Sequence, residues 1–286
     1  DGQESQTQEA VNGNILRLTA TAPSEFTETL EVGDIDNLEF SDLGNNSKVI
    51  EIWLPTSAIV EIAEVAASSE ITPAPVDSRK HWLHYGSSIS QCIEANRPMD
   101  AWALRAAQLL NLNITNFGLA GQCQLDGFVA RSMAALPADL ITLKLGINIV
   151  NADSMRERAF IPAVHNFLDI LRESAPHTPI IIISSIWCPF HEEIPGPTMI
   201  DGPTLFGIER PAEFAAGALT LQRTREILKD VVAKRIDPNL HFMDGLTLFG
   251  ASDEANLPDK LHPNSAGYRL MGERFAKAQR AFTESL

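Results

Sequence analysis

Short apolar runs alternate with longer amphipathic segments along the chain from residue 80 onward. The runs are rich in Ile, Leu, Phe and Trp, whereas the segments between them are twelve or more residues long. This alternation is typical of strands that lie parallel in one sheet and are connected by helices that cover both of its faces. The predicted strands are residues 81–86, 114–118, 140–146, 179–187 and 240–245.

Two of the amphipathic segments show the period of a helix that buries one face. The spacing i, i+3, i+4 and i+7 occurs at Val164, Phe167, Leu168 and Leu171. The second stripe consists of Tyr268, Met271, Phe275, Ala278 and Phe282. We interpret both stripes as surfaces that pack against the core, and we assign no chemistry to them.

The first 75 residues have a different texture, with short segments rich in Val, Ile, Leu and Thr between Gly, Asn, Asp and Pro. This pattern predicts a small antiparallel β-sandwich, similar to a jelly roll, over residues 1–75. Its strands are expected at residues 14–22, 26–32, 37–40 and 49–55. Residues 59–67 fit a helix or a strand by periodicity, and their neighbours favour a strand. A Pro-containing stretch, residues 71–80, predicts a boundary before a catalytic domain over residues 80–286.

The net charge, the cysteine spacing and the hydropathy of the chain exclude several classes of function. The net charge is −15, and residues 1–78 carry fifteen acidic side chains against Arg17 and Lys48. Such a surface repels phosphate backbones, so we expect no nucleic-acid partner. The three cysteines have no zinc-binding spacing, and we expect neither a metal nor another cofactor. No apolar run is long enough to span a membrane, whereas the compartment and the oligomeric state stay open.

The predicted topology selects the residues that can form a site. In an open parallel sheet, ligands bind beyond the carboxyl ends of the strands. The residues that follow the predicted strands are Ser87 and Ser88, Gly121, Asn148, and the loops 188–210 and 246–262.

These positions contain the side chains that nucleophilic catalysis by serine requires. Ser88 lies where a strand ends and a helix is expected to begin, in YGSSIS. Asp259 and His262 are three residues apart in DKLHPN, and this spacing lets the carboxylate reach Nδ1 of the imidazole while Nε2 faces the serine. The sequence therefore predicts a triad of Ser88, His262 and Asp259.

Four short blocks resemble the GDSL, or SGNH, hydrolases. The segment Gly86-Ser87-Ser88-Ile89 corresponds to the family's Gly-Asp-Ser block, and NFGLAG corresponds to its glycine block. The segment LGIN corresponds to the family's Gly-x-Asn-Asp block. The last block, Asp-x-x-His-Pro, is matched by residues 259–263. The resemblance covers about residues 80–282. It implies a flavodoxin-like three-layer α/β fold, with Ser88 as the nucleophile. It also implies an oxyanion hole formed by Ser88, Gly121 and Asn148.

The chain departs from the family pattern at two positions. Ser87 stands where the family usually has Asp, and Ile149 stands where an Asp usually follows the oxyanion Asn. Neither position is the nucleophile, the base or an oxyanion donor, so we expect activity to survive. The departures affect how the nucleophile turn is held and which substrates are accepted.

Several of these residues have a second interpretation. Ser88 alone fits a helix cap, and Ser87 is a competing nucleophile. His84 is more typical of a buried core histidine, and His191 to Glu193 of a solvated loop. The aromatic residues Trp187, Phe190 and Trp82 fit either a substrate pocket or the core. Cys92 and Cys123 follow neighbouring strands, so a disulfide between them is open.

The resemblance favours a serine esterase that acts on a small-molecule or carbohydrate ester. We expect short-chain esters, in particular O-acetyl groups on a sugar, because an N-terminal sandwich accompanies the catalytic unit in some carbohydrate esterases. The alternatives are a lipase or lysophospholipase with the same triad, an enzyme that transfers the acyl group to a sugar, and a non-catalytic carbohydrate-binding protein on the same fold.

Overall fold

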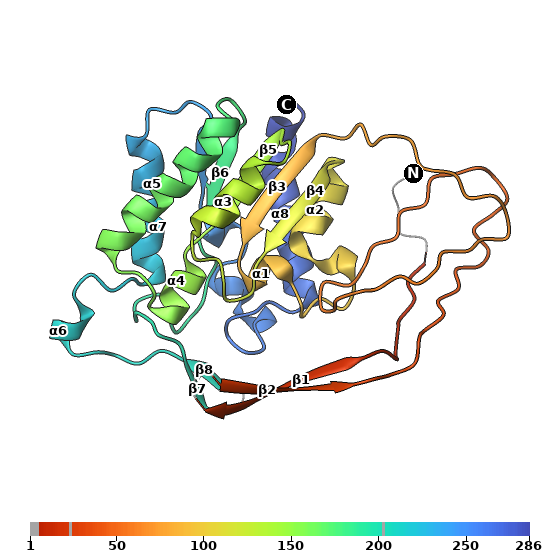
Figure 1. Cartoon of the computed structure of the whole chain (residues 1–286). Coiled ribbons are helices and arrows are strands. Elements are labelled where there is room, and N and C mark those ends of the chain that lie inside the picture. Colours follow the sequence, from red (N-terminus) through yellow and green to blue (C-terminus); the bar gives the residue numbers. More distant parts are fainter. Residues whose placement is uncertain (1–5, 23–24, 202–203) are drawn as a thin grey trace. The chain divides into compact units, whose positions relative to one another are not determined.

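A five-stranded parallel sheet forms the centre of the computed structural model, which describes residues 6–22, 25–201 and 204–286. Its strand order is β4-β3-β5-β6-β9, with every neighbouring pair parallel. The strands are β3 (His81–Gly86), β4 (Asn113–Gly118), β5 (Leu140–Lys144), β6 (Ile180–Ile183) and β9 (Leu240–Met243). All five overlap predicted strands, although β5, β6 and β9 end two to four residues earlier than predicted. Helices flank the sheet (Figure 1), so the flavodoxin-like three-layer fold is confirmed.

Alternation along β3 shows how the sheet buries both faces. Trp82 stacks on Phe275 of α8 (Ser265–Thr283), with ring centroids 5.1 Å apart. Tyr85 points to the opposite face and stacks on Phe167 of α5 (Glu157–Ser174) at 4.9 Å. Because successive side chains of a strand point to opposite faces, these contacts place α8 and α5 in different layers. Trp82 is thus a fully buried core residue.

The remaining helices complete the two layers and the connections. They are α1 (Ser88–Gln91), α2 (Trp102–Leu110), α3 (Gly127–Ala134), α4 (Ile147–Ala152), α6 (Ala212–Ala215) and α7 (Leu221–Lys234), with 3₁₀ turns at η1 (Pro98–Asp100), η2 (Gly245–Thr247) and η3 (Ala251–Asn256). The stripe predicted in α5 is buried as expected. In α8, however, Ala278 is exposed, because the buried face of the helix runs through Gly272 and Ala276 instead.

The N-terminal part has fewer strands than predicted. The chain divides into two compact units, Asp1–Glu51 and Ile52–Leu286. In the first unit, β1 (Ile15–Ala22) pairs antiparallel with β2 (Glu25–Glu31). Residues 37–40, 49–55 and 59–67 form no strand, contrary to prediction. Many of their apolar side chains are not covered by a second sheet: Ile59, for example, is 97% exposed. The assignment of residues 1–75 to a separate sandwich domain stays a prediction.

The long connection after β6 carries a second small sheet. Its strands are β7 (Met199–Asp201) and β8 (Thr204–Phe206), which pair antiparallel and are followed by α6. This connection leads into α7 and contains several of the residues discussed below. Over the part of the chain that the structure describes, no helix combines the length and the apolar character that crossing a bilayer requires.

Candidate active site

The turn after β3 presents Ser88 and buries Ser87. Ser87 caps α1: its hydroxyl accepts a hydrogen bond from the backbone N–H of Ile89 at 3.3 Å, and its side chain is fully buried. Ser88, the first residue of the helix, is only partly buried. Gly86 is required at the end of the strand, because a Cβ there would lie 2.1 Å from Oγ of Ser90. The two candidate nucleophiles therefore have different environments, and Ser88 is the accessible one.

The loop before α8 brings a histidine and a carboxylate to Ser88. Oγ of Ser88 lies 2.9 Å from Nε2 of His262, and Nδ1 of His262 lies 2.6 Å from Oδ2 of Asp259. The other carboxylate oxygen of Asp259 accepts the backbone N–H groups of Leu261 and His262 at 2.9 and 2.7 Å. Lys260 adopts the left-handed conformation inside this turn, with φ of 64°. Asp259 thus holds both the backbone of the turn and the orientation of the imidazole.

Charge and burial oppose each other at His262. Burial lowers the pKa of its imidazole, but the hydrogen bond to Asp259 and the negative charges of Glu94 and Asp259 outweigh burial and raise the pKa above its ordinary value. Burial works against ionisation of Asp259 as well, yet the hydrogen bonds from His262 and Leu261 lower the pKa of this carboxyl to about 2. At neutral pH the acid is therefore ionised and can stabilise an imidazolium.

Two further predicted donors flank the nucleophile turn. Gly121 lies in the turn after β4 with φ of +69°, a conformation that favours glycine. The side chain of Asn148, at the start of α4, is buried, and its Oδ1 accepts the backbone N–H of Cys123 at 3.0 Å. With Oδ1 used in this way, the Nδ2 group is the end of the amide that can donate to an oxyanion. Both residues follow strands that neighbour β3.

A buried hydrogen-bond network connects β3 and β5 to the turn that carries Ser88. His84 lies in β3, with Nδ1 2.6 Å from Oγ1 of Thr142 and Nε2 2.8 Å from Oγ of Ser90. Burial, with a smaller effect from the charge of Lys144, lowers the pKa of His84 to about 3, so the ring is neutral. Trp82 also donates to Thr142 at 2.8 Å. His84 is therefore a satisfied core histidine, as predicted, and it anchors α1 through Ser90.

The loop after β6 corrects one prediction. His191 and Glu192 are buried and do not belong to a solvated loop; only Glu193 is exposed. The reason is Arg225 of α7, whose guanidinium forms a bidentate ion pair with Glu192 at 2.6 and 2.8 Å. Arg225 also donates to the backbone carbonyl of Ser185. This partner is not visible in the sequence pattern, because Arg225 is thirty-three residues away from Glu192.

The aromatic residues of the same loop stay substrate-contact candidates. Trp187 and Phe190 are both partly buried and pack against the core cluster. The indole N–H of Trp187 donates to Glu254 at 2.9 Å, and the ring of Phe190 lies 4.7 Å from that of His191. These contacts fix the two rings on the loop, and their role toward a substrate is a prediction.

Two charged residues near the site were missed by the sequence analysis. Glu94 lies in the turn after α1, with Oε1 3.8 Å from Nδ1 of His262. Lys144 is fully buried at the end of β5, where burial lowers its pKa to about 8. Its Nζ finds no hydrogen-bond partner among the described residues. A lysine inside the apolar run LITLKLG was a visible signal for a special environment, whereas Glu94 had none.

The three cysteines are buried and free, so Cys92 and Cys123 are not bonded to each other in the structure. Burial raises the pKa of the Cys92 thiol far above its ordinary value and raises that of the Cys123 thiol to about 12. Both thiols are therefore protonated at neutral pH, the form in which a cysteine is a poor nucleophile.

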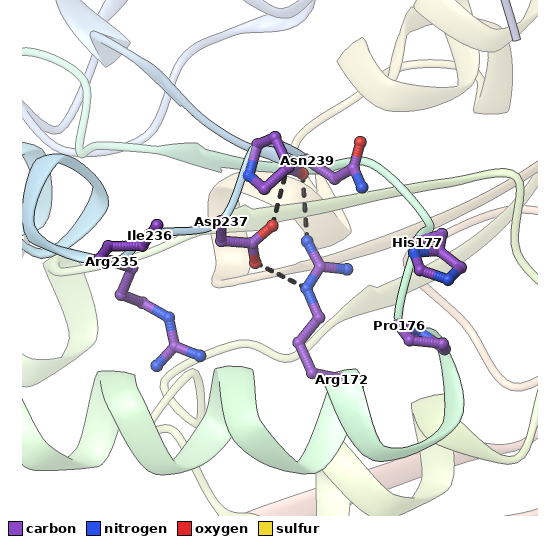
Figure 2. A pocket seen from close by; sticks show the side chains of 8 residues that line it. Arg172, Pro176, His177, Arg235, Ile236, Asp237 and Asn239 are labelled. Atoms are coloured by element: carbon purple, nitrogen blue, oxygen red, sulfur yellow. Dashed lines mark hydrogen bonds and ion pairs between the residues drawn. The ribbon is translucent and has the colours of Figure 1, made fainter.

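A surface hollow far from Ser88 is lined by side chains that bond to the chain itself. Its lining residues, Arg172, His177 and Asp237 among others, come from the end of α5 and from the segments that precede β6 and β9. Figure 2 shows their side chains. Nε of Arg172 donates to Asp237 at 2.8 Å, and its remaining N–H groups donate to the backbone carbonyls of Ala175, Thr178 and Asn239. Four of the five N–H groups of this guanidinium thus bond to the chain itself. The hollow lies at the end of the sheet opposite to Ser88.

Comparison with known proteins assigns the family. The model of the GDSL-like lipase/acylhydrolase family matches residues 84–270. The chain belongs to this family, and the matched residues include Ser88, Asp259 and His262. None of the curated proteins compared with the chain matches it.

Solved structures share the fold. The chain is 29% identical to the salicylyl-acyltransferase SsfX3 from a tetracycline biosynthetic pathway, with a TM-score of 0.60 over 73% of this chain and 56% of that one. A GDSL-like lipase from Bacteroides ovatus is 23% identical, with a TM-score of 0.57 over 77% and 58%. A family two carbohydrate esterase from Clostridium thermocellum is 16% identical, with a TM-score of 0.54 over 77% and 69%. The chain spans less than three fifths of the first two proteins.

Proposed function

We propose that the protein is a serine esterase in which Ser88 is the nucleophile, His262 the general base and Asp259 the acid that orients it. The observation that carries this proposal is the continuous hydrogen-bonded series from Ser88 through His262 to Asp259, at 2.9 and 2.6 Å. The first of these bonds joins residues 174 positions apart, and the alternative for Ser88, a helix cap, requires no such partner.

In the first half of the proposed reaction, Oγ of Ser88 attacks the carbonyl carbon of an ester. His262 takes the hydroxyl proton on Nε2, and Asp259 stabilises the imidazolium through Nδ1. The negative charge that develops on the carbonyl oxygen is received by the backbone N–H groups of Ser88 and Gly121 and by Nδ2 of Asn148. His262 then donates its proton to the leaving alcohol, and an acyl-serine is left.

In the second half, water replaces the alcohol. His262 removes a proton from the water as it attacks the acyl-serine, and the same three donors stabilise the second oxyanion. Return of the proton to Oγ of Ser88 releases the acid. Every step uses one base that alternates between its neutral and protonated forms, so the pKa of His262 sets the pH range of the reaction.

The pH dependence follows from that pKa. His262 must be neutral to accept the proton of Ser88, and its pKa is raised above the ordinary value of about 6.5. A raised pKa keeps the base protonated to higher pH, so kcat/KM for an aryl acetate is expected to rise with a midpoint above pH 6.5. Initial rates between pH 5 and 9 measure this limb. A rate that is constant from pH 5 to 8 would argue against a histidine base.

The proposed substrates are short-chain esters, in particular O-acetyl groups on carbohydrate. The expectation from the sequence depended on an N-terminal sandwich, and residues 37–40, 49–55 and 59–67 do not form its strands. The remaining support is the fold that the chain shares with a family two carbohydrate esterase. A lipase or lysophospholipase is the alternative with the same triad.

Chain-length preference separates these substrates. For 4-nitrophenyl esters from acetate to decanoate, we expect kcat/KM to be highest for acetate and to fall by at least tenfold by octanoate. The same panel run with Ser88→Ala serves as the background, and acetylated xylose or cellobiose tests the sugar. A maximum at eight carbons or more would favour the lipase.

Acyl transfer is the second candidate, and one comparison favours it. The protein with 29% identity is named as a salicylyl-acyltransferase. Transfer differs from hydrolysis only in the acceptor that attacks the acyl-serine, an alcohol in place of water. Adding a sugar or glycerol at increasing concentration to an aryl acetate assay distinguishes them, because a transferase forms the new ester at the expense of acetate.

A further inference from the structure

Glu94 occupies a fixed position beside the imidazole of His262. It lies in the turn that follows α1, only six residues after Ser88. One oxygen of its carboxylate, Oε2, accepts a hydrogen bond from the hydroxyl of Tyr268 at 2.7 Å. Tyr268 is fully buried in α8, where burial and nearby negative charge raise its pKa, so it stays a hydrogen-bond donor. The carboxylate is therefore held by a rigid donor and is not a freely rotating surface group.

The other oxygen of Glu94 faces the histidine. Oε1 lies 3.8 Å from Nδ1 of His262, too far for a hydrogen bond but within strong electrostatic reach. The side chain of Glu94 is 29% exposed and that of His262 is 19% exposed, so solvent screens the pair only partly. Nδ1 is thus approached by two carboxylates, Asp259 at hydrogen-bond distance and Glu94 at about one ångström more.

The turn that carries Glu94 is attached to the start of α8. The backbone N–H of Asn96 donates to Oγ of Ser265 at 2.7 Å, and Ser265 is the first residue of the helix. His262 comes three residues earlier in the same segment. The turn and the catalytic loop are therefore linked twice, through Ser265 and through Tyr268, and this linkage keeps Glu94 at its distance from the ring.

The remaining charged group near His262 has the opposite sign. Lys144 lowers the pKa of His262 slightly, whereas Asp259 and Glu94 raise it. Since Asp259 is engaged with the backbone of its own turn, Glu94 is the group whose charge can be removed without dismantling that turn.

We propose that Glu94 is a positioning residue of the active site, a second carboxylate that stabilises the imidazolium of His262 and supports its orientation together with Asp259. The proton on Nδ1 stays on the histidine during the reaction, and Glu94 acts only through its charge and its fixed place. When Asp259 is absent, Glu94 is close enough to become the partner of Nδ1. This inference rests on the proposed function of His262 as the general base.

Glu94→Gln tests the electrostatic part. Loss of one negative charge at 3.8 Å makes the imidazolium less stable, so the midpoint of the acidic limb of kcat/KM is expected to shift to lower pH by roughly half to one unit. Tyr268→Phe removes the hydroxyl that donates to Glu94, and we expect this variant to shift the midpoint to lower pH by a smaller amount. Glu226→Gln is the matched control, because Glu226 is an exposed carboxylate of α7 that pairs with Arg223. The acidic limb of kcat/KM for Glu226→Gln should have the same midpoint as that of the wild type.

A double-mutant comparison tests the backup role. Asp259→Ala and the double variant Asp259→Ala/Glu94→Gln lose the same contacts in the catalytic turn, so they differ only in Glu94. We expect the double variant to be about tenfold slower than Asp259→Ala, a larger factor than Glu94→Gln causes in the presence of Asp259. Equal factors in the two backgrounds, together with an unshifted limb in Glu94→Gln, would overturn the proposal.

The titration of His262 can also be followed without catalysis. In the Ser88→Ala background, NMR of the imidazole C–H protons reports the pKa of His262 directly, and Glu94→Gln should lower it. If Ser88→Ala retains wild-type turnover, the proposed function fails. If Ser88→Ala is inactive while the pKa of His262 is the same with and without Glu94, only the inference about Glu94 fails.

Discussion

Replacing Ser88 by alanine will lower kcat for an aryl acetate by roughly 10⁴- to 10⁶-fold, the range typical of the loss of a serine nucleophile. The hydroxyl of Ser88 is the group that lies 2.9 Å from Nε2 of His262, and alanine leaves the base with nothing to deprotonate. The fold should be unchanged, because Ser88 is partly exposed and the cap of α1 is provided by Ser87. Initial rates and a thermal unfolding curve, measured on the same preparations, check both statements.

Ser87→Ala is the matched control for this prediction. It removes an adjacent hydroxyl that is buried and bonded to the backbone N–H of Ile89. Loss of such a cap costs about 1 kcal/mol of the free energy of unfolding. The activity should stay within about tenfold of the wild type. If Ser87→Ala were inactive and Ser88→Ala active, the assignment of the nucleophile would be reversed.

Replacing Asn148 by alanine will lower kcat by about 10²- to 10³-fold with little change in KM, as expected when one oxyanion donor is lost. The amide of Asn148 is oriented by the hydrogen bond from the backbone N–H of Cys123 to Oδ1, which leaves Nδ2 as the donor. Because the charge it receives develops only in the transition state, binding of the ground-state ester should be nearly unaffected. Steady-state kinetics of both parameters provide the measurement.

Asn151→Ala is the control on the same helix. Oδ1 of Asn151 accepts a hydrogen bond from Thr198 of the loop after β6 at 3.0 Å. Its loss is expected to change kcat by no more than a few fold. A kcat of Asn148→Ala that also stays within a few fold of the wild type would remove Asn148 from the oxyanion hole.

The parts of the fold that could be predicted are those that hydrophobic periodicity determines. The buried strand β6 consists of four isoleucines, and such a run between turn residues has few alternatives in an α/β chain. A parallel sheet places its ligand site at the carboxyl ends of its strands, and Ser88 and Asn148 follow two of the predicted strands. The spacing of Asp259 and His262 was informative because two residues three positions apart lie in the same turn, so their side chains can meet without any distant partner.

What could not be predicted depends on partners that are distant along the chain. Residues 49–55 have the composition of a strand, but a strand forms only where a second strand and a covering layer are available, and their apolar side chains are exposed. Glu192 was expected in solvent because Arg225 is not visible as its partner in the sequence. Glu94 has no signal of its own, and only the packing of α8 against the turn after α1 brings it to His262.

The most direct test of the central claim is covalent labelling with a fluorophosphonate, followed by peptide mass spectrometry. If Ser88 is activated by His262, the reagent will form one stoichiometric adduct on Ser88, and His262→Ala will abolish or greatly slow its formation. Absence of an adduct in the folded wild-type protein, or an adduct on a different serine, would contradict the account.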